Sequence, residues 1–146
     1  MPQVVSHLSE LQFYAVRSGR LEIFDFGGSI PNDIWQFWGA DLKEKCWCVD
    51  MMLERGDNTA WRYKRDPSFM LPREEAVKTS PTGIRYLAPW IVLFFKAKHC
   101  RAKDQQDFDC VAPRLTVEDR SKLVAWLEKF HPNHVWLTQL NKFSNK

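Results

Sequence analysis

The sequence predicts an α+β protein, with a mixed or antiparallel sheet in the first half and a C-terminal group of helices. Two observations predict this fold class. Up to about residue 66, short runs rich in aromatic and β-branched residues are separated by turn residues, which is typical of strands. After residue 88, apolar residues recur at helical spacing, and Pro and Thr stand where helices would begin.

The first half is expected to contain one short helix and then paired strands. An amphipathic helix is predicted to begin near Ser6, since Leu8 and Leu11 are spaced as on one helix face. Ser18-Gly19 divides the next run into two strands of a hairpin. After a turn at residues 27–33, we expect further extended runs at residues 34–38, 46–53 and 60–66.

The second half is expected to hold helices with recognisable starts. Pro89 occupies a first-turn position of a helix that ends in basic residues. Asp104 is the predicted N-cap of the next helix, and Thr116 that of a third helix reaching Phe130. A last short helix is predicted after Pro132.

Length and hydropathy limit the class of protein. With 146 residues, of which 45% are hydrophobic, the chain is expected to form a single domain over residues 1–146. The first twelve residues lack the features of a signal peptide, and the longest apolar run, at residues 91–95, is too short to span a bilayer. We therefore expect a cytoplasmic protein with no membrane partner.

Charge and cysteine spacing exclude two further classes of site. The net charge of +3 is small, and basic residues are mixed with acids, so we expect no dedicated nucleic-acid binding. The four cysteines include no CxxC and no His at zinc-finger spacing. They are expected to be reduced and mostly buried thiols.

The segment CWCVDMMLE, residues 46–54, places an acid inside an apolar strand. Strand alternation would put Asp50 on one face with Cys48 and Met52, and Val49 and Met51 on the other. An unpaired carboxylate in a sheet core costs several kcal/mol. Asp50 should therefore have a partner or reach an open face.

Several motifs together resemble a known family. CWCVDMMLERGDNTAWRYKRDP, TGIRYLAP, VLFFKAKHCRAKDQQDF and FHPNHVWL occur in this order, and the likeness extends from about Leu21 onward. They resemble a bacterial group of small nucleotidyltransferase-like proteins, related to aminoglycoside and lincosamide nucleotidyltransferases. The resemblance implies a nucleotidyltransferase-like fold and metal-assisted nucleotidyl transfer, in which a DxD pair and a third carboxylate hold divalent cations.

The chain departs from that family in two ways. No DxD precedes Asp50, and the nearest likeness, Asp41-Leu42-Lys43, has a lysine that cannot ligate magnesium. The chain is thus identified as a truncated member, incomplete at its N-terminus, such as mobile or rearranged genes would produce. Trp90 stands where similar members carry Glu, so we expect it to pack or to line an apolar pocket.

The resemblance implies roles for four residues. Asp50 matches the third carboxylate, as a vestigial catalytic residue and a weak metal ligand. Lys96, Arg101 and Lys103 match the KAKHxRxKD pattern and would bind nucleotide phosphates. The structural alternatives are an inherited acid satisfied by a neighbouring Arg, Lys or water, and solvated charges at a helix end. No cofactor is required, and Mg²⁺ matters only if activity is retained.

His131 and His134 are spaced by three, as metal ligands on a short helix would be, but no third ligand is evident. Capping or packing at the start of the last helix is the favoured interpretation. The seven tryptophans exceed what a small core needs unless some line a cavity or an interface. Because truncation would expose apolar surface, we expect a homodimer.

Two hypotheses of function follow. The first is a non-catalytic remnant of a nucleotidyltransferase-like protein that self-associates and keeps a small-molecule or nucleotide pocket. The second is a metal-dependent nucleotidyltransferase completed by a partner chain that supplies the missing DxD acids.

Overall fold

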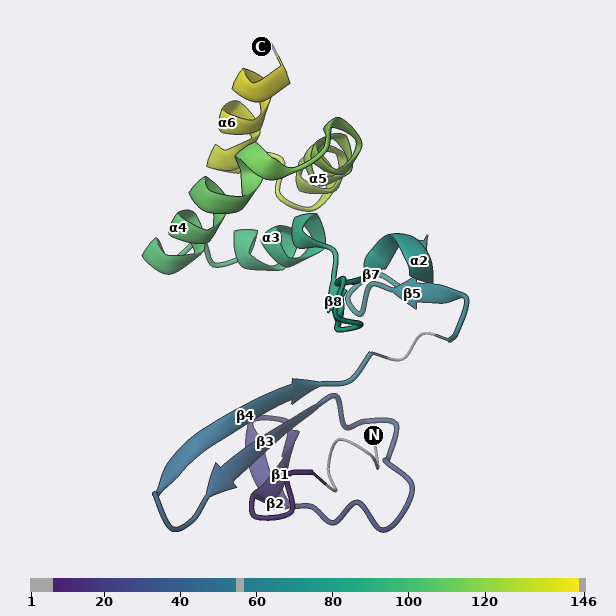
Figure 1. The fold of residues 1–146 in the computed structure, drawn as a ribbon, viewed down its shortest axis with the longest axis vertical. Coiled ribbons are helices and arrows are strands. Elements are labelled where there is room, and N and C mark those ends of the chain that lie inside the picture. Colours follow the sequence, from purple (N-terminus) through teal and green to yellow (C-terminus); the bar gives the residue numbers. More distant parts are fainter. Residues whose placement is uncertain (1–6, 55–56, 145–146) are drawn as a thin grey trace. The chain divides into compact units, whose positions relative to one another are not determined.

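The α+β fold class is confirmed by a computed structural model, which describes residues 7–54 and 57–144. Antiparallel strands fill the first half and helices the C-terminal half (Figure 1). Where the sequence predicts one domain, contacts within the chain group it into two compact units. The first unit is Met1–Asp57 with Arg62–Phe69, and the second is Asn58–Trp61 with Met70–Lys146. Each unit is described by itself.

The first unit is built on a four-stranded sheet with the order β2-β1-β3-β4, in which all neighbours are antiparallel. Its strands are β1 Gln12–Arg17, β2 Arg20–Ile23, β3 Gln36–Asp41 and β4 Cys46–Met52. The predicted hairpin at Ser18-Gly19 is confirmed. Both residues have positive φ, 48° and 78°, as a type I′ turn requires, and Gly19 adopts this conformation without steric cost.

The helix predicted near Ser6 is wrong for the residues that the structure describes, while Ser6 itself lies outside them. Residues 7–10 form a turn, and β1 begins at Gln12. Leu8 and Leu11 pack against the sheet core instead of lying on a helix face. Two apolar residues three apart suit a tight turn as well as a helix, so the spacing alone did not distinguish them.

One face of the sheet, the inner face, carries the core of the first unit. Phe13, Ala15, Ile34 and Phe37 are buried there. Rings from the segment after β2 cover them, since Phe24 and Phe26 lie 4.9 and 4.8 Å from Phe37 between ring centroids. Burial of each large apolar side chain contributes about 1.5–3 kcal/mol to the stability of the fold. Because all of these residues belong to the first unit, the sheet has a hydrophobic core of its own.

A β-bulge interrupts the pairing of β3 with β4. Gly39 is paired with Val49 and Ala40 with Trp47, so that Cys48 is the extra residue on β4. The insertion reverses the alternation beyond it. Trp47 therefore joins Asp50 on the face opposite the core, which we call the outer face. The regular alternation expected along this strand is interrupted at Cys48.

Shorter elements connect the sheet to the helices. β5 Ala60–Arg62 and β6 Met70–Pro72 form a two-stranded sheet, and the helical turn α2 Arg73–Ala76 follows. β7 Val77–Thr79 and β8 Arg85–Leu87 pair as an antiparallel hairpin. The predicted strand at residues 60–66 thus ends at Arg62, because the chain turns back at residues 64–68 to begin β6.

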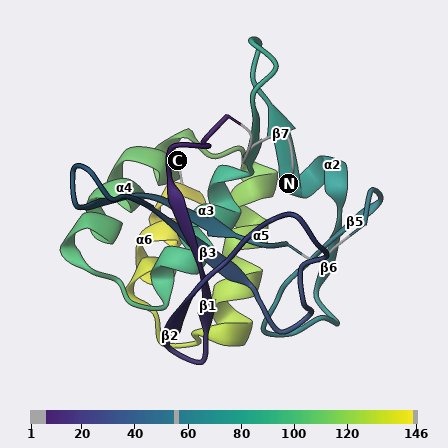
Figure 2. The same cartoon turned by 90° about the horizontal axis from the view of Figure 1, so that it is seen from below.

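Four α-helices make up most of the second unit (Figures 1 and 2). They are α3 Pro89–Ala97, α4 Ala102–Val111, α5 Val117–Phe130 and α6 Val135–Ser144, with a 3₁₀ turn, Ala112–Arg114, after α4. The predicted starts at Pro89 and Thr116 are confirmed, and the Thr116 side chain accepts a hydrogen bond from the Asp119 amide at 3.1 Å. Among the described residues, no helix is both long and apolar enough to cross a membrane.

Aromatic side chains fill the space between these helices. Trp90 is fully buried and meets Trp126 edge to face at 5.1 Å, and Phe94 meets the same ring at 5.1 Å. Phe108 of α4 stacks on Trp136 of α6 at 4.4 Å. The expectation that Trp90 packs is confirmed, and four of the seven tryptophans, Trp61, Trp90, Trp126 and Trp136, are core residues.

We predict that Gly39→Ala destabilises the first unit by about 1–3 kcal/mol, since a Cβ there overpacks a filled core. It would lie 2.9 Å from the buried ring of Phe13, which faces Gly39 across the strand pair. The measurement is chemical denaturation followed by circular dichroism. Gly28→Ala is the control, because a Cβ at Gly28 meets nothing within 4 Å. Equal stability of the two variants would contradict the prediction.

Candidate functional site

Asp50 lies on the outer face of the sheet, and its side chain is exposed. Its carboxylate accepts a hydrogen bond from the Gln36 side-chain amide at 2.7 Å. Asp50 therefore lies on an open face and also has a neutral hydrogen-bond partner, so its carboxylate does not carry the cost of burial in a sheet core. Within the described part of the chain, no group of three or more His, Cys, Asp or Glu is arranged to hold a metal ion.

Aromatic side chains accompany Asp50 on the outer face. Trp47 contacts Tyr14 at 5.5 Å and Trp38 at 5.2 Å, both edge to face. The pairing aligns Ile23, Tyr14, Trp38 and Asp50 in one row across the four strands. In this row the indole N–H of Trp38 is buried without a hydrogen-bond partner among the described residues.

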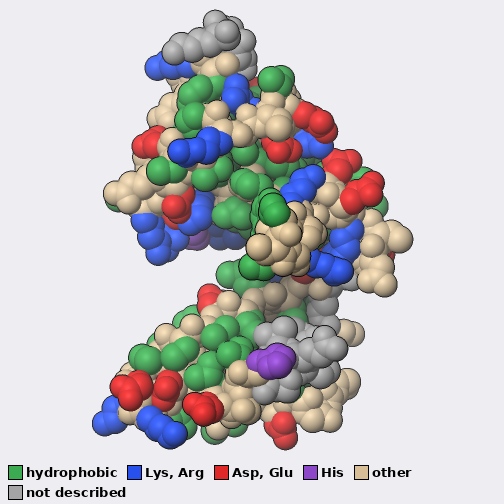
Figure 3. Space-filling view, in the orientation of Figure 1, with side chains coloured by type: hydrophobic (Ala, Val, Ile, Leu, Met, Phe, Trp, Pro, Cys, Tyr) green, Lys and Arg blue, Asp and Glu red, His purple; other side chains and the backbone are tan. Residues whose placement is uncertain are grey.

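The edges of the outer face expose large apolar side chains. The exposed fractions are 73% for Ile23 and 42% for Leu21 on β2, and 53% for Trp47 and 77% for Met52 on β4. Figure 3 shows hydrophobic side chains at the surface over β3 and β4, with charged side chains gathered near the turn between them. We call the set consisting of Tyr14, Leu21, Ile23, Trp38, Trp47 and Met52 the outer apolar face.

Two cysteines lie beside the bulge. The sulfurs of Cys46 and Cys48 are 3.6 Å apart, and both side chains are exposed. The expectation of mostly buried thiols is wrong, because Cys110 is also exposed and Cys100 is only partly covered. The hydrogen bond with Cys48 raises the pKa of the Cys46 thiol, and slight desolvation and the charges of Cys48 and Asp41 add to this effect.

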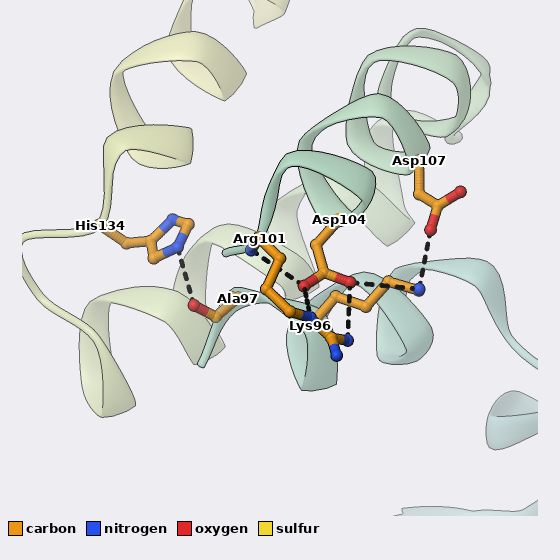
Figure 4. Close-up of polar contacts among 6 residues, drawn as sticks. All are labelled: Lys96, Ala97, Arg101, Asp104, Asp107 and His134. Atoms are coloured by element: carbon orange, nitrogen blue, oxygen red, sulfur yellow. Dashed lines mark hydrogen bonds and ion pairs between the residues drawn. The ribbon is translucent and has the colours of Figure 1, made fainter. Parts of the chain in front are cut away.

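Two of the three predicted phosphate-binding residues, Lys96 and Arg101, converge on an acid of the second unit (Figure 4). Arg101 contacts the Asp104 carboxylate through Nε at 2.8 Å, and Lys96 contacts it at 3.5 Å. Lys96 also pairs with Asp107 at 2.7 Å. Lys103 is exposed and makes no hydrogen bond or ion pair with other described residues.

Asp104 is fully buried in the first turn of α4. Its ion pair with Lys96 links this turn to the end of α3. Its carboxylate accepts a hydrogen bond from the Arg101 amide at 3.0 Å. Asp104 is thus the third residue of α4 in a capping box, and its predicted role as the N-cap is wrong because Arg101 holds that position. The Arg101 side chain holds the pKa of the Asp104 carboxyl well below its usual range, and the bond to Asp107 raises the pKa of Lys96.

His134 is satisfied by the backbone. Its Nδ1 accepts a hydrogen bond from the Trp136 amide at 3.1 Å, so Nε2 carries the proton and donates to the Ala97 carbonyl at 3.0 Å. Burial lowers the pKa of His134, which favours this neutral form. The predicted capping and packing at the start of α6 are confirmed.

The predicted site residues fall into two places. Asp50 belongs to the first unit, whereas Lys96, Arg101 and Lys103 belong to the second. Lys96 and Arg101 meet at Asp104, and their charges are neutralised by Asp104 and Asp107, which both belong to α4. Asp104 stands three residues after Arg101 and supplies the acidic half of a capping box, and the arginine three residues before an acid could have indicated a structural ion pair.

Comparisons with known proteins do not assign the chain to a family. No protein-family model matches the chain, and neither the curated proteins nor the solved structures give a significant match. The relation to nucleotidyltransferases therefore stays a prediction from the motifs of the sequence.

We predict that Asp104→Asn lowers the midpoint of thermal unfolding by about 5–10 °C, because the amide leaves Arg101 and Lys96 without their shared charge. Asp107→Asn is the matched control. Because the Asp107 carboxylate is half exposed, this substitution should lower the midpoint by less than about 2 °C. The contribution of Asp104 is present above the ordinary carboxyl pKa of 3.8 and is lost as pH falls below it. If the difference in unfolding midpoint between wild type and Asp104→Asn stayed the same in acid, the stabilising role of the ionised Asp104 carboxylate would be contradicted.

Proposed function

We propose that the chain is a non-catalytic interaction protein that self-associates through the outer apolar face of its four-stranded sheet. The observation that carries this proposal is the exposure of Ile23, Trp47 and Met52 on one side of that sheet. Single exposed apolar residues are common on monomers, whereas a contiguous apolar patch of several hundred Å² marks an interaction surface.

The size of the sheet fixes the expected strength. Three strands of six or seven residues and one of four, set side by side in one sheet, give a face of roughly 15 by 20 Å at most. Stable interfaces bury about 800 Å² on each partner. The outer apolar face falls below that value, so the dimer is expected to form at micromolar concentration.

A second copy suits this face better than a nucleic acid. A two-fold axis along the strands places β2 of one copy over β4 of the other, so that Leu21 and Ile23 meet Trp47 and Met52 twice. The only charged side chain in the aligned row is the acid Asp50. A phosphate backbone would be repelled there, whereas a carboxylate on an edge strand remains hydrated at the rim of a dimer.

The contacts of the basic residues favour a non-catalytic protein over the transferase hypothesis. Lys96 and Arg101 are held by Asp104 and Asp107, so binding a triphosphate would require those ion pairs to break. Asp50 has a neutral partner in Gln36, and a single carboxylate is a poor magnesium site. The nucleotidyltransferase completed by a partner chain stays a second hypothesis.

We predict that Ile23→Glu and Met52→Glu each weaken self-association at least about tenfold, because each buries a charge in the contact. Both side chains are more than 70% exposed in the single chain, so the fold should tolerate the change. Sedimentation velocity at micromolar concentrations measures the effect. Val117→Glu, on an exposed apolar side chain at the start of α5, is the control and should leave association unchanged. A monomeric wild type would refute the proposal.

Titration with ATP and Mg²⁺ separates the two hypotheses. For the interaction protein we predict no binding that depends on Asp50, so calorimetric curves of wild type and Asp50→Asn should coincide. The substitution keeps an oxygen that can accept the hydrogen bond from Gln36. Binding by the wild type that is lost in Asp50→Asn would instead favour the transferase.

A further inference from the structure

The exposed thiols of Cys46 and Cys48 are the only two cysteine side chains of the described residues that the structure places in contact. Their sulfurs are 3.6 Å apart, which leaves about 1.5 Å to close before the length of a disulfide bond is reached. Cys100 and Cys110 belong to the second unit. The pair thus has the proximity that an intramolecular disulfide requires.

The bulge explains this proximity. In a regular strand, residues two apart are separated by two full rises, about 6.6–6.8 Å between Cα atoms, near the upper limit for a disulfide. Cys48 is the extra residue on β4 and has no opposite partner in β3. A bulged residue is bent out of the regular extended path, and the sulfur of Cys48 lies close enough to that of Cys46 for a thiol hydrogen bond.

Access is the second requirement. β4 is an edge strand, and both thiols are exposed to solvent. The edge position leaves room for a small disulfide to approach either thiol with its S–S bond in line with the attacking sulfur. Asp41, whose carboxylate accepts amide hydrogen bonds from Lys43 and Glu44, holds the adjoining turn in place.

We propose that Cys46 and Cys48 form a redox-active dithiol, which exchange with a low-molecular-weight disulfide converts reversibly to an intramolecular disulfide. One thiolate attacks a sulfur of the small disulfide, whose S–S bond breaks and releases one small thiolate. The second protein thiolate then attacks the protein sulfur of the mixed disulfide and releases the other small thiolate. Two protein thiols are oxidised, the small disulfide is reduced to two thiols, and the two protons pass to these products.

The small ring suits a reversible function. Closing a disulfide across a single intervening residue restricts its dihedral angle, and strained, exposed disulfides are the ones that thiols reduce easily. The pair is therefore expected to respond to the surrounding thiol pool and not to act as a permanent crosslink. Trp47 lies between the two cysteines, so oxidation alters the backbone at a residue of the outer apolar face.

The test is treatment of the reduced 146-residue protein with glutathione disulfide, then with N-ethylmaleimide, followed by intact-mass spectrometry. The double variant Cys100→Ser/Cys110→Ser keeps only the pair, and most of it should lose two hydrogens, bind no maleimide and carry no glutathione. Excess reduced glutathione should restore two maleimide adducts. Cys46→Ser and Cys48→Ser in the same background should instead each retain one glutathione on the remaining thiol.

Two results would overturn the proposal. One is a double variant that stays fully reactive to maleimide after treatment. The other is a double variant that retains glutathione, as the single-thiol proteins are expected to do. Circular dichroism checks that each variant is folded, and the double variant tests the chemistry without any substitution at the pair itself.

Discussion

The β-bulge at Cys48 is the constraint on which the surface chemistry of the first unit depends. One extra residue on β4 moves Trp47 to the outer face, where its ring meets Tyr14 and Trp38. The same residue brings a second thiol within contact of Cys46. Bulges cost ladder pairing and recur where a strand must redirect a side chain. Here one insertion creates both an aromatic surface and a thiol pair on the same edge strand.

The two units use polar groups in opposite ways. In the helical unit, Asp104 is buried because two cations and a backbone amide compensate its charge, and the cluster fixes the junction of α3 and α4. In the sheet unit, Asp50 is exposed and has a neutral partner. Asp104 therefore stabilises its unit from a buried position, whereas Asp50 is exposed beside apolar side chains that are also exposed.

Much of the fold could be predicted from local patterns, whereas the site could not. The Ser18-Gly19 turn and the helix starts at Pro89 and Thr116 follow from residue chemistry acting over a few positions. The bulge was missed because it depends on pairing with β3, which alternation along β4 alone does not reveal. The sequence places Asp104 at the N-cap, three positions before its place as the third helical residue, because a capping acid has a similar local signature at either position.

The most direct test of this account is the cross-strand pairing of β3 with β4, measured by nuclear Overhauser effects in the isotope-labelled protein. The bulged register pairs Ala40 with Trp47 and leaves Cys48 without an opposite residue. We therefore predict cross-strand contacts between Ala40 and Trp47, together with ring contacts from Trp47 to Tyr14 and Trp38. Contacts between Ala40 and Cys48, with Trp47 directed to the core face, would indicate a regular ladder and contradict the account.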